Sequence, residues 1–217
     1  MEMTLKPPQQ ARSQETLAAI LSASEALLEA RPFDEISVQE ITQAAGSSTG
    51  SFYARFRGKE DLLPHLYSRF DDRLADRISA LDAGRDWASM PLADIIDLCI
   101  TEHIRAYAER PHLMREFTLY VRRAGAAGPP GGTARRSRLF AGAVGRLTAA
   151  RTTDGRPVRP EAATFILSVI GMVVREAVLF GDLPLARAGA VSHSTLRREL
   201  GELAMAYLAA GNATDRA

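Results

Sequence analysis

Apolar residues recur along most of this chain at intervals of three and four positions, which is the spacing of one face of an α-helix. No segment alternates apolar and polar residues as a half-buried strand does. The pattern therefore predicts an all-α protein without an internal repeat. The segments with helical spacing are 17–28, 37–45, 49–56, 59–78, 92–108, 112–122, 134–151, 160–180 and 194–210.

Capping and turn residues mark the ends of the early helices. Ser37 and Glu40 have the spacing of a capping box, in which each side chain bonds to the backbone amide of the other residue. Gly46 permits the left-handed turn that ends this helix, and Ser48 caps the next one. Pro64 lies inside the following helix, so we expect it to remove one backbone hydrogen bond and to bend the first turns.

Composition narrows the class of protein without identifying a function. The 217 residues are 46% hydrophobic and 24% charged, as in an ordinary globular protein. Cys99 is the one cysteine, which excludes an internal disulfide and favours a reducing, cytoplasmic location. The longest apolar stretch, residues 162–174, falls short of the roughly 20 residues of a membrane span. The first residues lack the apolar core of a secretion signal, so we expect no membrane association.

No motif predicts a metal, a cofactor or a catalytic centre. The four histidines show no close ligand spacing, and the glycine-rich residues 125–132 are not followed by the Gly-Lys-Ser/Thr of a phosphate-binding loop. Residues 46–50 match the G-x-S-x-G of a serine hydrolase, with Ser48 as the nucleophile. That motif needs a strand before it, and the preceding segment is predicted to be helical.

The net charge, 27 − 26 = +1, gives no general attraction to a polyanion, so nucleic-acid binding would have to rest on local charge. Such a segment exists between residues 41 and 59. It contains Arg55, Arg57 and Lys59 and no acidic residue. One face of the molecule is therefore a candidate cationic surface.

Residues 37–56 combine two short helices and a glycine turn, the pattern of a helix-turn-helix whose second helix enters the major groove of DNA. The second helix begins with small hydroxyl residues, which let its backbone approach base edges in a groove about 12 Å wide. Tyr53 is long enough to reach a phosphate. Lys59 stands at the start of the next helix, where free amides and the helix dipole also attract an anion. Alternatively, Tyr53 and Phe56 are core aromatics, the better interpretation for Phe56, and Arg55 and Arg57 form a solvated face.

These residues resemble the TetR family of bacterial repressors over about residues 20–63. The resemblance rests on Ile20-Leu21, Ala23, Leu28, Phe33, Ser37-Val38, Glu40-Ile41, Ala45-Gly46, Ser48, Gly50, Phe52-Tyr53, Phe56, Lys59-Glu60 and Leu62-Leu63. Three positions depart from the family pattern: Leu17 replaces a common arginine, Pro32 a common glycine, and Ser47 a buried aliphatic residue of the turn.

The resemblance implies a three-helix DNA-binding domain over residues 1–58, with the helix-turn-helix at 37–56, and a larger helical effector-binding and dimerisation domain over residues 59–217. It also implies that residues 47–51 face bases, while Tyr53 and Lys59 hold phosphates. The DNA-binding residues that we expect are Ser47, Ser48, Thr49, Gly50, Ser51, Tyr53, Arg55 and Lys59.

Two apolar helices near the end of the chain predict a homodimer through a four-helix interface; the alternative is that both lie inside a monomer core. The expected interface residues are Phe165, Ile166, Val169, Ile170, Val173, Val174, Val178, Leu196, Leu200, Leu203, Tyr207 and Leu208. The resemblance to the TetR family also implies that the intervening helices enclose a ligand cavity. Its candidate lining is Trp87, Cys99, His103, Tyr107, Met114, Phe117, Tyr120, Phe140 and Met172, although each of these also fits an ordinary core.

The function implied is that of a ligand-responsive transcriptional regulator, most often a repressor, which binds double-stranded operator DNA as a homodimer and responds to a small, largely apolar or aromatic effector. An architectural DNA-binding protein without an effector is the alternative, followed by a serine hydrolase that uses Ser48. We expect no enzymatic activity.

Overall fold

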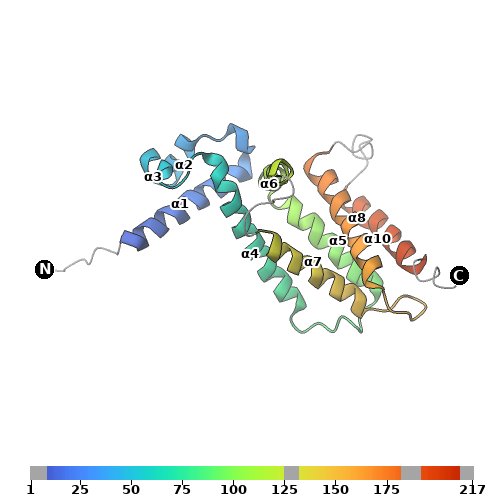
Figure 1. The fold of residues 1–217 in the computed structure, drawn as a ribbon. Coiled ribbons are helices and arrows are strands. Elements are labelled where there is room, and N and C mark those ends of the chain that lie inside the picture. The colour runs from blue at the N-terminus through green and yellow to red at the C-terminus, as the bar shows by residue number, and fades with distance from the viewer. Residues whose placement is uncertain (1–8, 125–131, 182–191, 211–217) are drawn as a thin grey trace. The chain divides into compact units, whose positions relative to one another are not determined.

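The computed structural model describes residues 9–124, 132–181 and 192–210, and its regular structure there is helical (Figure 1). In these ranges the one β-type pairing is an isolated bridge between Arg151 and Pro157. The predicted all-α class is confirmed. The elements are α1 (Gln9–Ala30), η1 (Phe33–Glu35), α2 (Val38–Ala44), α3 (Thr49–Tyr53), η2 (Lys59–Leu62), α4 (Leu63–Asp82), α5 (Leu92–Ala108), α6 (Pro111–Ala124), α7 (Gly132–Ala149), α8 (Pro160–Leu179) and α10 (His193–Ala210), where η denotes a 3₁₀ helix.

The predicted capping box is present at the start of α2. The Ser37 hydroxyl accepts from the backbone amide of Glu40 at 3.2 Å, and a Glu40 carboxylate oxygen accepts from the Ser37 amide at 2.9 Å. Arg31 adds an ion pair to the same carboxylate at 2.8 Å. The Ser37 backbone bond, followed by the Arg31 bond, lowers the pKa of Glu40 to about 2. The first helix of the motif therefore begins at a sharply defined point.

The expected bend at Pro64 does not occur inside a continuous α-helix. The segment starts as the 3₁₀ helix η2, and α4 begins only at Leu63. Pro64 thus occupies the first turn of α4, where a backbone N–H has no partner within the helix and its loss is harmless. The change of helix type replaces the predicted kink.

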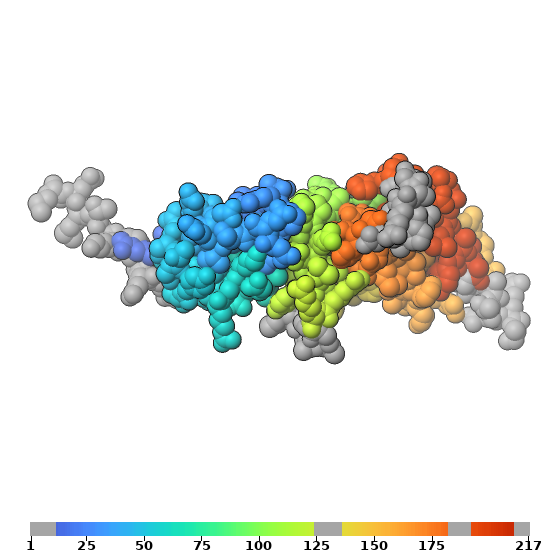
Figure 2. Space-filling view, turned by 90° about the horizontal axis from the view of Figure 1, so that it is seen from above, coloured from blue at the N-terminus to red at the C-terminus, as the bar shows by residue number. Residues whose placement is uncertain are grey.

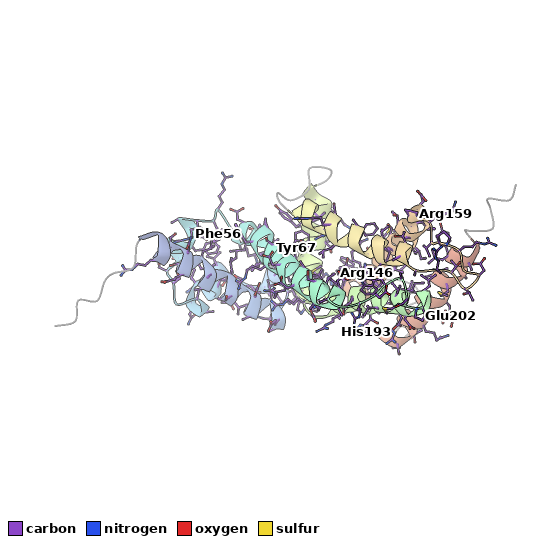
Figure 3. All side chains as sticks on the ribbon, turned by 90° about the horizontal axis from the view of Figure 1, so that it is seen from below. Phe56, Tyr67, Arg146, Arg159, His193 and Glu202 are labelled. Atoms are coloured by element: carbon purple, nitrogen blue, oxygen red, sulfur yellow. The ribbon has the colours of Figure 1, made fainter. Side chains whose placement is uncertain are left out.

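The chain forms two compact units, residues 1–70 with 112–130 and residues 71–111 with 131–217. This division differs from the expected boundary after residue 58, because the start of α4 and α6 from His112 onward belong to the first unit. Tyr67 of α4, labelled in Figure 3, stacks nearly parallel to Phe117 of α6, and both rings are buried. The spacing of apolar residues within one helix cannot predict an aromatic contact between segments that lie 50 residues apart in the sequence.

The second unit has its core where α5 meets α8, α10 and α7. Ile95, Ile96 and Ile100 of α5 and Ile166 and Ile170 of α8 are essentially inaccessible. By length and composition α8 is the one described helix that would reach across a membrane, and part of it is buried in this core. An ion pair lies outside this core: Arg146 of α7, labelled in Figure 3, forms a bidentate salt bridge with Asp82 at 2.7 and 2.8 Å.

Candidate nucleic-acid interface

The turn between α2 and α3 is closed by backbone hydrogen bonds. Gly46 has φ = 59°, the left-handed conformation in which a side chain is strained. The amide of Ser47 donates to the Thr42 carbonyl at 2.9 Å, and the amide of Gly46 donates to the Gln43 carbonyl at 3.1 Å. These bonds satisfy the end of α2 and turn the chain directly into α3.

An aromatic contact holds α3 in place. Phe52 is completely buried, and its ring lies 5.1 Å from that of Phe56, centre to centre. The helix covers Thr49–Tyr53 and not the predicted 49–56, because Ala54 is its C-cap. Phe56 lies beyond the helix and is buried, as its core interpretation predicts.

The surface of α3 presents Thr49, Gly50 and Tyr53 to solvent. Tyr53 is 58% exposed, which excludes the alternative that it is a core aromatic. Ser47 is half-buried. Two predicted base-facing residues are engaged locally: the Ser48 hydroxyl accepts from the Ser51 amide at 3.1 Å and donates to the Ser51 hydroxyl at 3.0 Å.

Residues 46–50 match the hydrolase motif in sequence but not in structure. The residues before Ser48 form α2, where an elbow needs a strand. The Ser48 hydroxyl caps α3, so its local geometry is that of a helix terminus.

Arg55 and Lys59 donate hydrogen bonds within the protein, and their contacts with phosphate stay predictions. Arg55 donates to the Ser51 carbonyl at 2.6 Å and to the Ser13 hydroxyl at 3.1 Å, which ties α3 to α1. Lys59 donates to three backbone carbonyls of the segment between α1 and α2, at 2.8, 3.2 and 3.0 Å. Sequence reasoning missed both sets of partners, because they come from segments up to 42 residues away.

The structure divides the candidate ligand-lining residues between the two units. Met114, Phe117 and Tyr120 lie on α6 in the first unit, where Met114 and Phe117 are buried. Tyr120 packs against Phe117 at 6.2 Å between ring centres. Phe117 thus packs against both Tyr67 and Tyr120.

Three candidates on α5 form a polar stripe in the second unit. Cys99, His103 and Tyr107 are spaced four residues apart, and Nδ1 of His103 hydrogen-bonds the Cys99 carbonyl at 2.7 Å. Burial lowers the pKa of His103, and burial raises the pKa of Tyr107 and raises that of Cys99 to about 11. All three side chains are thus uncharged at neutral pH. A side chain at Gly171 of α8 would come within 3.7 Å of the His103 ring, so this stripe faces α8.

The remaining candidates have different surroundings. Trp87 is half-buried, and the guanidinium carbons of Arg85 and Arg146 lie 5.7 and 5.4 Å from its ring centre. Phe140 is half-buried against the core of the second unit. Met172 is 50% exposed on α8, so in this unit its side chain reaches solvent.

The expected dimer residues also separate into two sets. Six of them are buried in the chain's own core and are not available to a partner: Ile166, Ile170, Val174, Leu196, Leu200 and Leu208. Val169, Val173, Val178 and Tyr207 are half-buried. Phe165 and Leu203 are 55% and 49% exposed. Helical spacing identified the apolar helices, but not which of their faces turns inward.

The fold and the exposed capped helix define a helical protein with an N-terminal helix-turn-helix of the DNA-binding kind. Residues 20–72 match the model of the bacterial regulatory proteins of the tetR family. An uncharacterised HTH-type transcriptional regulator of Bacillus subtilis, YwcC, is 37% identical over 60 residues, a match that spans 28% of this chain and 27% of that protein. The similarity to the TetR family of bacterial regulatory proteins therefore lies in this N-terminal segment of the chain.

Solved structures share the fold over nearly the whole chain. A TetR-family regulator from Streptomyces coelicolor has a TM-score of 0.55 at 20% identity and 96% coverage of both chains. A TetR regulator from Rhodococcus sp. RHA1 has a TM-score of 0.52 at 17% identity, with 89% of this chain and 97% of that chain covered. The fatty acid degradation regulator FadR from Bacillus halodurans has a TM-score of 0.54 at 16% identity, with 87% and 93% covered. At these identities the likeness concerns the fold alone.

Two glycines of the motif provide a matched pair of substitutions. Gly46→Ala places a side chain in a left-handed conformation and should lower the free energy of unfolding by about 1–2 kcal/mol. Gly50 is helical, and an added Cβ meets nothing closer than the Ser48 hydroxyl at 3.8 Å. Gly50→Ala should therefore stabilise the protein by up to about 1 kcal/mol, while its new methyl group weakens the approach of α3 to duplex DNA. Thermal unfolding and DNA titration measure the two effects.

Equal stability changes for the two variants would show that backbone conformation does not distinguish the positions. Unchanged DNA affinity in Gly50→Ala would show that the exposed backbone of α3 is not at the interface.

Proposed function

We propose that this protein is a transcriptional regulator that inserts α3 into the major groove of operator DNA, binds as a homodimer and releases the DNA in response to a small effector. The observation that carries the proposal is the surface of α3. Thr49, Gly50 and Tyr53 are exposed together on a helix that the buried Phe52 and the Ser48 cap hold in place.

Thr49, Gly50 and Tyr53 are proposed to have different roles in DNA binding. The Thr49 hydroxyl is a donor and acceptor at the start of the helix, where recognition helices contact base edges. Gly50 adds no side chain between the backbone and the groove. The phenol of Tyr53 lies one turn further along and has the length to donate to a phosphate, which positions the protein without reading sequence.

The proposal predicts different effects for the two side chains. Tyr53→Phe removes one hydrogen bond to a charged acceptor and should weaken binding about tenfold at every sequence. Thr49→Ala should change affinity mainly where the operator base that it contacts is varied, by about 1–3 kcal/mol at that position. Fluorescence anisotropy with the DNA upstream of the protein's own gene, and with single-base variants of it, measures both.

If Thr49→Ala lowered DNA affinity equally at all sequences, the proposed role of Thr49 in base recognition would be contradicted. Absence of any salt-sensitive, sequence-selective complex with the unaltered protein would contradict the proposal as a whole.

The homodimer is proposed from the outward faces of α8 and α10. These helices pack against each other and reach the surface together, in orange and red (Figure 2). Phe165, Met172 and Leu203 are exposed there, and the Phe165 ring lies 5.1 Å from that of the half-buried Tyr207. With Tyr53 they are the large exposed hydrophobic residues of the described chain. A twofold interface would bury each of these residues in both subunits.

Charge placed on this face should separate the subunits. Phe165→Glu and Leu203→Glu each bury two carboxylates in a twofold interface, which costs several kcal/mol, so the dissociation constant of the dimer should rise by about 100-fold or more. Size-exclusion chromatography with light scattering measures the mass. Ala141→Glu, an exposed position on α7, adds the same charge elsewhere and serves as the control. Dimers that persist in both variants would place the interface on another surface.

The effector is proposed to bind beside the polar stripe of α5. Cys99, His103 and Tyr107 supply uncharged polar groups within an apolar helical core, and the His103 ring packs close to Gly171 of α8. A few polar groups in apolar surroundings suit a small, largely apolar or aromatic molecule. The second unit would then contain the control element, and the first unit the DNA contact.

Thermodynamic linkage makes the effector testable before its identity is known. A compound from an apolar and aromatic library that raises the melting temperature should weaken operator binding, and the operator should weaken binding of the compound by the same factor. Calorimetric titration of the compound with and without operator DNA measures the reciprocity. Compounds that bind without changing operator affinity would contradict the coupling, and a library without binders would favour the architectural alternative.

A further inference from the structure

The outward side of α3 carries no side chain that forms paired hydrogen bonds with a base. Thr49, Gly50 and Tyr53 are exposed there, together with Ala54, the C-cap residue of the helix. Guanine and adenine are distinguished in the major groove by bidentate contacts from arginine, lysine, asparagine or glutamine, and cytosine by an acidic side chain. Residues 47–54 include none of these types. Recognition of a base by α3 therefore has to use a hydroxyl, an apolar group or the backbone.

Thr49 is the residue of α3 that is best placed for such a contact. It is the first residue of the helix, directly after the Ser48 cap, and it is exposed. Recognition helices contact base edges with their N-terminal residues. Gly50 follows it, and a Cβ added there would meet nothing closer than the Ser48 hydroxyl at 3.8 Å. The space beyond Gly50 is therefore open, and a group on the DNA can approach Thr49 without meeting a second side chain at this position.

Thr49 offers two chemical groups, and they differ in what they can distinguish. Its hydroxyl both donates and accepts, and every base pair presents a partner for such a group in the major groove. Its γ-methyl group gains from contact with another apolar group. The 5-methyl group of thymine is the apolar group that the four bases present in the major groove. The γ-methyl group therefore distinguishes thymine from the other three bases, whereas the hydroxyl does not.

A contact between two methyl groups needs a rigid support, because dispersion attraction falls steeply with distance. Phe52 provides this support from inside: it is completely buried, and its ring meets that of Tyr53 edge to face, 5.4 Å between centres. The Ser48 hydroxyl accepts from the Ser51 amide at 3.1 Å and fixes the first turn. Thr49 lies in that turn, and its β-branched side chain has at most two favoured rotamers in a helix. Its γ-methyl group is thus held in a defined position.

We propose that Thr49 determines specificity for thymine, by packing its γ-methyl group against the 5-methyl group of a thymine in each half of the operator. The bare backbone of Gly50 lets the two methyl groups meet. This role rests on the proposed function, because it requires α3 to lie in the major groove. It leaves the phosphate contacts of other residues unaffected.

Deoxyuridine tests the contact on the DNA side, because it keeps every hydrogen-bonding group of thymidine and lacks only the methyl group. Each thymine of an operator fragment that binds the unaltered protein is replaced in turn, and the affinity is measured by fluorescence anisotropy. Burial of one methyl group corresponds to about a fourfold change in affinity. We expect a loss of this size for at least one thymine in each half-site.

Two substitutions test the contact on the protein side. Thr49→Val keeps a γ-methyl group and removes the hydroxyl, whereas Thr49→Ser keeps the hydroxyl and removes the methyl group. With Thr49→Val the loss caused by deoxyuridine at the sensitive thymine should remain about fourfold. With Thr49→Ser the thymine and deoxyuridine fragments should bind equally, which completes a double-mutant cycle. Because each variant is compared with itself on two DNA fragments, a general loss of stability or affinity cancels.

The inference would be overturned by a full deoxyuridine effect in Thr49→Ser, or by its disappearance in Thr49→Val. It would also be overturned if the unaltered protein selected an operator in which no thymine is sensitive to loss of its methyl group, and the proposed function would then stand. Absence of any sequence-selective complex would instead contradict the proposed function, and the role of Thr49 with it.

Discussion

Five residues are too few to form a stable helix in water, because the first turn costs more conformational entropy than its hydrogen bonds return. The position of α3 therefore depends on burial of Phe52, which is inaccessible to solvent and packed against Phe56. The left-handed Gly46 sets the direction in which α3 leaves α2. The side of α3 away from this core exposes Thr49, Gly50 and Tyr53, which are available for contact with another molecule.

Cations close to the motif mostly serve its internal structure. Arg31 pairs with the capping residue Glu40, Arg55 links α3 to α1, and Lys59 binds the carbonyls before α2. Two of the three basic residues between positions 41 and 59 thus donate hydrogen bonds within the protein. The surface proposed to contact DNA is formed at its exposed centre by a hydroxyl, a bare backbone and a phenol.

The second unit combines an apolar core with a small set of uncharged polar groups. α5 contributes buried isoleucines to the contacts with α8 and α10, and it also carries the stripe of Cys99, His103 and Tyr107. Burial keeps these groups neutral because a charge among packed helices would lose its hydration. α8 exposes Phe165 and α10 exposes Leu203 on the sides of these helices that face solvent. Ligand and partner are thus proposed for opposite sides of one helical layer.

The sequence alone determined the all-α class, the capping box at Ser37 and the short helix that begins after Ser48, because these features arise from contacts within a few residues. It did not determine that α6 packs with the first unit, that Met172 faces outward or that Ile166 and Ile170 face inward. An apolar stripe indicates that a helix has a buried side, but several helices offer similar stripes, and only their packing decides which meet. The partners of Arg55 and Lys59 were undetermined for the same reason: a flexible cation takes the carbonyl or hydroxyl that the tertiary fold brings within reach.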